Sequence, residues 1–311
     1  MVTHSGTPAL AELAGRDFLC SADLSAEQTS QLLLLASDLK HGRRRIDLAG
    51  RSLGLIFSKA STRTRVSFTV AMARLGGQTI DLNPQVSQVG RGEPVADTAR
   101  VLSRYVDALA IRTFAQSELE EYAHWASIPV INALTDLEHP CQALADYLTM
   151  AECFAGGADG QLELERLQGL TMAYVGDGNN VAHSLMVCGA LLGVNVRIGG
   201  PAGYGPAGYQ PSAAVLEQAR HLAGDRCTIS VLQDPVDTVR GAHALYTDVW
   251  ASMGQEEEKA ARERDFSGWC LNEELVAEAD ARAIVLHCLP AYRGLEISAG
   301  AMEGSSNRIF E

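Results

Sequence analysis

The feature that most constrains this chain is the alternation of short apolar segments with helix-like segments along most of its length. Strands are predicted at 52–58 and 107–114, for example, and a helix at 25–40. Strands that alternate with helices favour parallel sheets covered by helices on both faces. We therefore predict an α/β protein with two doubly wound parallel-sheet domains, residues 1–150 and 151–311.

Composition excludes several classes of protein. The net charge of −13 disfavours nucleic acid as a partner, because phosphate backbones bind to basic surfaces. No apolar run approaches the ~20 residues that a membrane helix needs. The seven cysteines form no Cys-x-x-Cys pair, and the N-terminus lacks the basic start and apolar stretch of a signal peptide. These features predict a cytoplasmic protein with no membrane association.

Polar clusters follow many of the predicted strands. In open α/β sheets, ligands bind at the carboxyl ends of the strands. Two domains that both present polar loops there favour an enzyme, with its active site in the cleft between the domains. The clusters are STRTR at 61–65, Arg112, HPCQ at 139–142, GDGNN at 176–180, DVWASMGQ at 248–255 and HCLPAYRG at 287–294.

The segment STRTR at 61–65 has three hydroxyl groups and two guanidinium groups at the predicted start of a helix. A helix N-terminus attracts anions, and this set of donors suits a phosphate better than a carboxylate. The segment is not the Gly-rich nucleotide loop that ends in Gly-Lys. An ordinary N-cap beside solvated arginines is the alternative interpretation.

The other motifs are weak when each is taken alone. GDGNN lacks the third glycine of a dinucleotide-binding loop, because Val181 stands in its place. Asn179 and Asn180 are as typical of helix caps as of ligand contacts. His139 has the alternative role of a structural histidine, and Cys288 that of a small buried apolar residue.

Taken together, the motifs resemble those of the transcarbamylases, and among these the ornithine carbamoyltransferases. STRTR, SQVGRGEP, IRT, HPCQALAD, GDGNNVAHS, DVWASMGQ and HCLP occur in the order of that family, from residue 17 to the end. STRTR and the His-Pro-x-Gln element are shared with the aspartate carbamoyltransferases. The Ser-Met-Gly and His-Cys-Leu-Pro elements indicate ornithine.

The resemblance implies that the first domain binds carbamoyl phosphate. Three residues, Arg112, His139 and Gln142, would hold the carbamoyl group. Gln88 would reach the phosphate bound by a neighbouring subunit, which implies a homotrimer. The residues implied to hold the phosphate in the same subunit are Ser61, Thr62, Arg63 and Thr64.

The resemblance also implies that the second domain binds L-ornithine. The carboxylate of Asp248 suits the α-ammonium group, and Cys288 would lie at the position of the δ-amine. The full set of implied ornithine-binding residues is Asn180, Asp248, Ser252, Met253, Cys288 and Leu289.

The implied reaction transfers the carbamoyl group of carbamoyl phosphate to the δ-amine of ornithine, which gives citrulline and phosphate, as in arginine biosynthesis. A primary amine has a pKa of ~10, so its ammonium form must lose a proton before it attacks. The implied catalytic residues are Arg112, His139, Cys288 and Asp248. The resemblance implies no metal and no organic cofactor.

Three alternatives remain. The substrate could be putrescine or an N-acylornithine, although the DxxxSMG pattern at 248–254 disfavours putrescine, which has no α-carboxylate. The chain could also be a catalytically impaired member of the family. Relatives continue past the segment at 306–311 into a final helix whose arginine contacts carbamoyl phosphate, and this sequence ends at Glu311. We therefore expect that helix to be absent.

Overall fold

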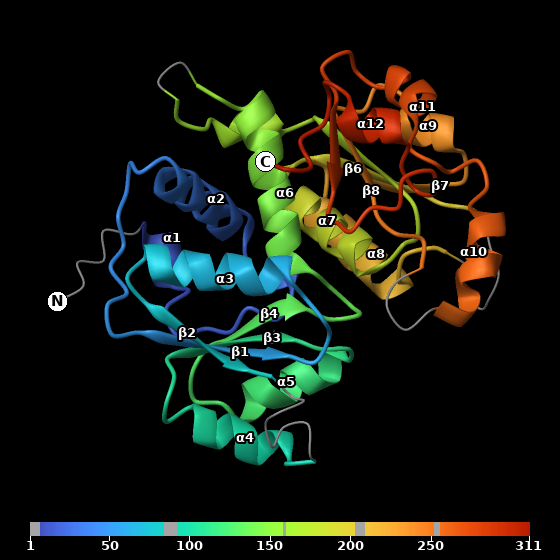
Figure 1. The fold of residues 1–311 in the computed structure, drawn as a ribbon. Helices are drawn as coiled ribbons and strands as arrows, with labels where there is room; N and C mark the ends of the chain where they lie inside the picture. Colours follow the sequence, from blue (N-terminus) through green and yellow to red (C-terminus); the bar gives the residue numbers. More distant parts are fainter. Residues whose placement is uncertain (1–6, 84–91, 158–159, 203–208, 252–255) are drawn as a thin grey trace. The chain divides into compact units, whose positions relative to one another are not determined.

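The computed structural model describes residues 7–83, 92–157, 160–202, 209–251 and 256–311, which form two compact units (Figure 1). The first unit is Met1–Cys141 and the second is Gln142–Glu311. The division falls within helix α6 (Pro140–Phe154), so that most of this helix belongs to the second unit. The domain boundary expected at residue 150 lies in the last turns of the same helix.

The first unit contains a parallel sheet of four strands in the order β2-β1-β3-β4. Figure 1 shows α3 on one side of this sheet and α4 with α5 on the other, as in a doubly wound fold. The strands are β1 (Ser52–Phe57), β2 (Gln78–Leu82), β3 (Ala108–Arg112) and β4 (Val130–Leu134). The helices are α1 (Pro8–Ala11), η1 (Ser21–Asp23), α2 (Ala26–Lys40), α3 (Arg63–Arg74), α4 (Val95–Leu102) and α5 (Gln116–Trp125).

The strand order of the first sheet creates a switch point between β1 and β3. From β1 the chain runs outward to β2, then returns to β3 on the other side of β1 and continues to β4. Every residue of β1 is buried, and Leu55, Leu109 and Ile111 are among the fully buried side chains. Loops that leave the carboxyl ends of β1 and β3 diverge, which leaves room for a ligand between them.

The second unit contains a parallel sheet of five strands in the order β7-β6-β5-β8-β9. The strands are β5 (Thr171–Val175), β6 (Asn195–Gly199), β7 (Ile229–Leu232), β8 (Ala244–Thr247) and β9 (Ile284–His287). Besides α6, the helices are η3 (Leu164–Leu167), α7 (Asn180–Leu192), α8 (Ala213–Ala223), α9 (Pro235–Val239), η4 (Glu256–Glu258), α10 (Lys259–Asp265), α11 (Glu273–Ala277) and α12 (Ala299–Glu303).

The second sheet has its switch point between β5 and β8. The chain passes from β5 to β6 and β7 on one side, then returns to β8 and β9 on the other. All residues of β5, β8 and β9 are buried, as the apolar sequence of these segments predicts. Helix α7 packs against α8 on one face, and α9 and α11 lie together on the other (Figure 1).

The predicted fold class is confirmed, because both sheets are parallel and their strands alternate with helices. The helix expected at 25–40 is α2, whose start is closed by a reciprocal capping pair between Ser25 and Gln28. Three α-helices that were not expected, α1, α10 and α12, have four, seven and five residues. Periodicity is not detectable over so few residues.

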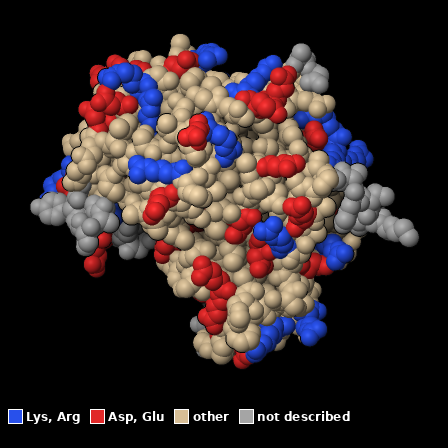
Figure 2. Space-filling view, turned by 180° about the vertical axis from the view of Figure 1, so that it is seen from behind, with Lys and Arg blue, Asp and Glu red and all other residues tan. Residues whose placement is uncertain are grey.

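All seven cysteines are free. No helix in the described ranges is long and apolar enough to cross a membrane. On the face drawn in Figure 2, acidic and basic side chains are interspersed over a largely uncharged surface, so this face has no broad area of a single charge.

Candidate active site

The STRTR segment lies where β1 ends and α3 begins, at the switch point of the first sheet. Thr62 occupies the N-cap position, but its side chain makes no capping hydrogen bond. An ordinary N-cap would use this hydroxyl to accept from a helix N–H group. The Thr62 hydroxyl is not used in this way. This favours the interpretation of STRTR as a phosphate site, in which the hydroxyl groups and the N–H groups of the first turn face a ligand together.

The two arginines of this segment differ in their surroundings. Arg65 forms an ion pair with Asp81 next to it on β2, and its guanidinium carbon lies 4.9 Å from the centre of the Phe57 ring. Arg63 is exposed at the first position of α3. Asp81 offsets the charge of Arg65, and Arg63 lies at the first position of α3, where a helix N-terminus attracts anions.

Thr64, Arg112 and His139 come together from three parts of the first unit. Arg112 ends β3 beside Phe57, the last residue of β1, and one of its terminal nitrogens donates to the Thr64 hydroxyl at 3.4 Å. His139 is buried, and burial, followed by the charge of Arg112, lowers the pKa of His139 to about 3. The imidazole is therefore neutral at physiological pH. A neutral imidazole N–H beside a guanidinium can donate to a carbonyl oxygen without accepting a proton.

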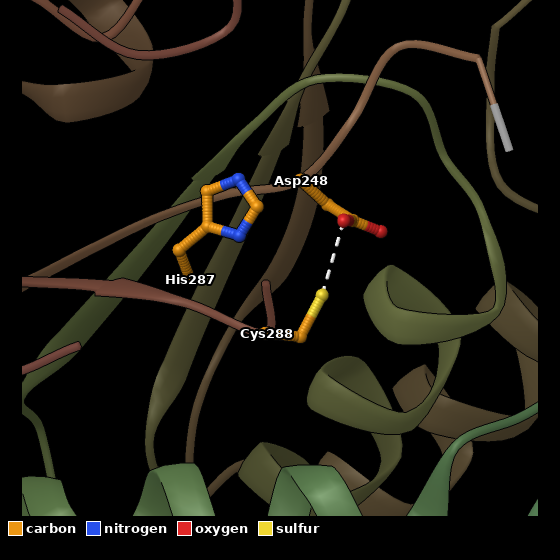
Figure 3. Close-up of side chains that lie close together, drawn as sticks. All are labelled: Asp248, His287 and Cys288. Atoms are coloured by element: carbon orange, nitrogen blue, oxygen red, sulfur yellow. Dashed lines mark hydrogen bonds between the residues drawn. The ribbon is translucent and has the colours of Figure 1, made fainter. Parts of the chain in front are cut away.

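Asp248 and Cys288 meet at the carboxyl ends of two neighbouring strands in the second unit. Thr247 at the end of β8 is paired with His287 at the end of β9, so the next residue of each strand lies beside the other. The Cys288 thiol donates to Asp248 Oδ1 at 3.0 Å (Figure 3). Burial and the Asp248 carboxylate raise the pKa of Cys288 well above its ordinary value. The sulfur is thus a neutral thiol that donates a hydrogen bond, rather than a nucleophilic thiolate.

Asn179 connects the start of α7 to Asp248 across the switch point between β5 and β8. Its Oδ1 accepts from the backbone N–H groups of Val181 and Ala182, which caps the helix. Its Nδ2 donates to Asp248 Oδ2 at 2.8 Å. The sequence left open whether this residue is a cap or a ligand contact, and in the structure it caps the helix and orients Asp248. Asn180 follows it as the first residue of α7.

Ligand atoms of Asp248, His287 and Cys288 lie within 4.8 Å of one another, a spacing that a metal ion would require. However, His287 Nδ1 accepts from the Leu289 N–H at 2.8 Å, and Nε2 contacts Glu296 Oε1 at 3.2 Å. Both ring nitrogens are therefore engaged within the protein. Figure 3 shows the imidazole beside the Cys288–Asp248 pair. Hydrogen bonding within the protein accounts for this cluster.

Leu289 is the one non-glycine residue with a positive φ in the part of the chain that the structure describes, at 61°. This conformation is unfavourable for a branched side chain, and the hydrogen bond from its N–H to His287 helps to hold it. Strained backbone of this kind is common at ligand sites, and Leu289 directly follows Cys288. Its predicted place beside the δ-amine is compatible with this geometry.

Two features of the second unit were not found from the sequence. Arg262 on α10 is buried and donates to Asp177 Oδ2 at 2.6 Å and to the Trp250 carbonyl at 2.8 Å, which connects the GDGNN turn to the segment after β8. Asp146 on α6 is buried and accepts from Gln142 Nε2 at 2.9 Å. The four-residue spacing within HPCQALAD could have predicted the second contact, because such residues share a helix face.

The structure thus brings together two groups of the predicted residues, one in each unit. The first-unit cluster is Ser61, Thr62, Arg63, Thr64, Arg112 and His139. The second-unit cluster is Asn180, Asp248, Cys288 and Leu289, with Asn179 added by the structure. Gln142 belongs to the second unit. Three predicted residues, Gln88, Ser252 and Met253, lie outside the described residues.

Comparison with known proteins assigns both units to one family. Residues 16–152 match the family described as "Aspartate/ornithine carbamoyltransferase, carbamoyl-P binding domain". Residues 168–311 match "Aspartate/ornithine carbamoyltransferase, Asp/Orn binding domain". The sequence is similar to the ornithine carbamoyltransferase of Prochlorococcus marinus strain MIT 9313, with 67% identity over 97% of this chain and 90% of the relative.

Solved structures show the same similarity. The ornithine carbamoyltransferase of Gloeobacter violaceus is 52% identical, with a TM-score of 0.82 over 94% of this chain and 91% of the other. The ornithine carbamoyltransferase of Pyrococcus furiosus is 44% identical, with a TM-score of 0.85 over 96% of this chain and 92% of the other.

Proposed function

Because the chain belongs to the aspartate/ornithine carbamoyltransferase family, we propose that it transfers the carbamoyl group of carbamoyl phosphate to the δ-amine of L-ornithine. The products are L-citrulline and phosphate. The observation that carries this proposal is the second-unit cluster, in which Asp248 is held by Asn179 and Cys288 at the carboxyl ends of adjacent strands. A carboxylate placed there suits an amino-acid substrate with a free α-ammonium group.

In the first unit, Ser61, Thr62, Arg63 and Thr64 hold the phosphate of carbamoyl phosphate at the start of α3. Arg112 and His139 donate to the carbonyl oxygen of the carbamoyl group. Negative charge develops on this oxygen as the amine attacks, and each well-placed donor contributes roughly 3 kcal/mol to the transition state. The neutral His139 supports this role, because its N–H donates while the positive charge comes from Arg112.

In the second unit, Asp248 binds the α-ammonium group of ornithine, and Asn180 with the Met253 backbone binds the α-carboxylate. The Cys288 thiol and Leu289 lie at the position of the δ-amine. The ammonium form of this amine loses one proton to solvent before attack. As the neutral amine attacks the carbamoyl carbon, the C–N bond forms and the C–O bond to phosphate breaks, and the leaving phosphate accepts the second proton from the nitrogen. The roles of these residues rest on the family resemblance and on the hydrogen bonds of Asp248.

The test is citrulline formation by the purified chain from carbamoyl phosphate and ornithine, with putrescine, N-acetylornithine and aspartate assayed in parallel. We expect turnover with ornithine. Putrescine and N-acetylornithine also present a free terminal primary amine, but putrescine lacks the α-carboxylate and N-acetylornithine lacks the α-ammonium group that would bind Asp248, and aspartate has no side-chain amine. Preferred turnover of putrescine or N-acetylornithine would reassign the amine substrate. No turnover of any substrate would favour an impaired family member.

We also propose a homotrimer in which Gln88 of one subunit reaches the phosphate bound by the next. Support comes from α3, which has no buried residue and presents Val66 and Val70 with exposed fractions of 54% and 41%. Apolar side chains exposed this far on one helix suit a contact with a second copy of the chain. We expect Val66→Asp with Val70→Asp to reduce the mass in analytical ultracentrifugation from trimer to monomer. Val101→Asp on α4, equally exposed, serves as the control.

Shared sites can be tested by mixing two inactive variants. Gln88→Ala subunits and Arg63→Ala subunits would each form trimers with defective phosphate contacts. In mixed trimers, some sites would combine an intact Gln88 from one subunit with an intact Arg63 from another. Recovery of activity after mixing is expected, and its absence in confirmed mixed trimers would show that Gln88 acts within its own subunit.

We propose that the enzyme acts in the cytoplasm, in arginine biosynthesis. The substrate, the product and the free cysteines support this setting. Expression in the cytoplasm of a bacterial strain that needs arginine because it lacks this activity is expected to restore growth without arginine. Growth restored only by added citrulline would contradict the proposal.

A further inference from the structure

Asp146 is a buried acid that the proposed reaction does not yet use. It lies on α6 one turn after Gln142, with an exposed fraction of 5%. Its Oδ1 accepts from Gln142 Nε2 at 2.9 Å. Its other oxygen, Oδ2, is buried, and the Asp146 carboxyl group interacts with the buried hydroxyl of Tyr246 on β8. An acid buried this fully with no cation to pair with it among these contacts is uncommon and calls for a functional explanation.

The surroundings of Asp146 belong to the second-unit cluster. Asp146 interacts electrostatically with Tyr246, Asp248 and Cys288. The Tyr246 ring stacks on Tyr174, with ring centres 5.8 Å apart, and the Tyr174 hydroxyl donates to Asn179. Asp146 therefore adjoins both Gln142, which is proposed to hold the carbamoyl group, and the side chains proposed to hold ornithine.

A glutamine amide needs a fixed orientation if it is to recognise the carbamoyl group. The amide has an acceptor oxygen on one side and a donor nitrogen on the other, and its terminal torsion is broad. Asp146 Oδ1 accepts from Nε2, so this contact turns Gln142 Oε1 away from Asp146. An oxygen in that position can accept from the NH₂ group of carbamoyl phosphate.

We propose that Asp146 is a positioning residue for carbamoyl transfer, which holds the Gln142 amide by Nε2 and thereby directs Gln142 Oε1 to the NH₂ group of the substrate. The inference rests on the proposed function. The neutral form of Asp146 serves this purpose, because its carbonyl oxygen still accepts from Gln142 while its O–H group adds no negative charge beside Asp248. Burial raises the pKa of Asp146 to about 8, which is consistent with a protonated acid at neutral pH.

The test compares Asp146→Asn, Asp146→Ala and Gln142→Ala in the full chain. Asparagine copies the neutral acid, because its oxygen can accept from Gln142 while its NH₂ group replaces the O–H. We expect Asp146→Asn to keep kcat within a few-fold of the original enzyme at pH 7. Asp146→Ala should lower kcat roughly 10-fold to 100-fold, which is the loss of rate expected when a reacting group is misplaced. Glu152→Gln, a charge-neutralising change further along α6, is the matched control.

Two readouts separate positioning from a structural role. Inorganic phosphate lacks the carbamoyl group, so Asp146→Ala should weaken the binding of carbamoyl phosphate but not that of inorganic phosphate. If Asp146 acts through Gln142, the double variant Asp146→Ala/Gln142→Ala should lose no more activity than Gln142→Ala alone. Multiplicative losses, or equal weakening of both ligands, would overturn the inference.

Failure of this inference is distinguishable from failure of the proposed function. If the unaltered chain produces no citrulline, the proposed function is wrong. If it produces citrulline and Asp146→Ala is as active as Glu152→Gln, only the role of Asp146 is wrong.

Discussion

In the first unit, the polar residues 61–65 at the start of α3 are half-buried or exposed, whereas in the second unit Asp248 after β8 is buried and Cys288 after β9 is half-buried. Both clusters occupy the switch point of a parallel sheet. The first uses cations, hydroxyl groups and a helix N-terminus. The second uses an acid that is held by an amide and a thiol. The switch point of the first sheet is therefore lined by cations, and that of the second sheet by an acid.

The difference follows from the ligands proposed for each unit. A phosphate has many oxygens and can be held by donors that are close in sequence, because a single helix start supplies several of them. An ammonium group requires an oriented acceptor. Asp248 must be held from two sides, and its two partners come from the segments after β5 and β9.

Asp248→Ala should cause the largest loss of activity. The loss should concern ornithine, the ligand proposed for the second unit, and not the binding of carbamoyl phosphate. It removes the carboxylate proposed for the α-ammonium group and leaves Asn179 and Cys288 without their partner. A lost hydrogen bond to a charged group costs about 3 kcal/mol, so kcat/KM for ornithine should fall at least ~100-fold. Steady-state kinetics and calorimetry with carbamoyl phosphate alone check this, with the exposed Asp225→Ala as control. An equal loss of carbamoyl phosphate binding would break the comparison between the clusters.

Arg63→Gln should produce the reciprocal result in the first unit. Removal of one guanidinium contact to phosphate should weaken carbamoyl phosphate binding roughly 10-fold to 100-fold, equivalent to about 1.5–3 kcal/mol. Ornithine specificity should not change. The control is Arg74→Gln at the opposite end of α3. Isothermal titration with carbamoyl phosphate measures the effect, and unchanged affinity would remove this residue from the phosphate site.

Variants of Cys288 should sharpen the description of the second-unit cluster. Because the thiol is a neutral donor to Asp248, serine should preserve the hydrogen bond and cost roughly ten-fold or less in kcat. Alanine should cost more than serine. The exposed Cys153→Ala is the control. If serine and alanine were equally damaging, the sulfur itself would be needed, and the role as hydrogen-bond donor would be wrong.

The smallest effect concerns pH and stability. Asp146 has a pKa of about 8 in the folded chain, above the ~3.9 of an unfolded aspartate, so the folded state binds more protons between these values. Its contribution to stability is therefore lost as pH rises from about 4 to about 8. Asp146→Asn removes this dependence and should raise Tm by several degrees more at pH 8 than at pH 5. Asp225→Asn, measured by the same thermal unfolding, should show no such difference.

Much of the fold and of the first-unit cluster could be predicted from the sequence. The alternation of apolar and helix-like segments predicted the two parallel sheets, because the spacing of apolar residues differs between a buried strand and a helix that buries one face. STRTR could be interpreted locally, since a helix start and its side chains are continuous in sequence. Helix α10, with its buried Arg262, could not be predicted, because a helix of seven residues has too short a pattern.

The second-unit cluster depended on the tertiary structure. Without the family resemblance, Cys288 was as consistent with a buried apolar residue and Asn179 with a simple cap, because their partners are distant in sequence. Only the strand order places the segments after β5, β8 and β9 side by side and brings Asn179 and Cys288 to Asp248. Likewise, burial in the tertiary structure is the main cause of the altered pKa values of His139 and Asp146. Local order is encoded by neighbouring residues, whereas hydrogen-bond partners and desolvation arise from contacts between distant ones.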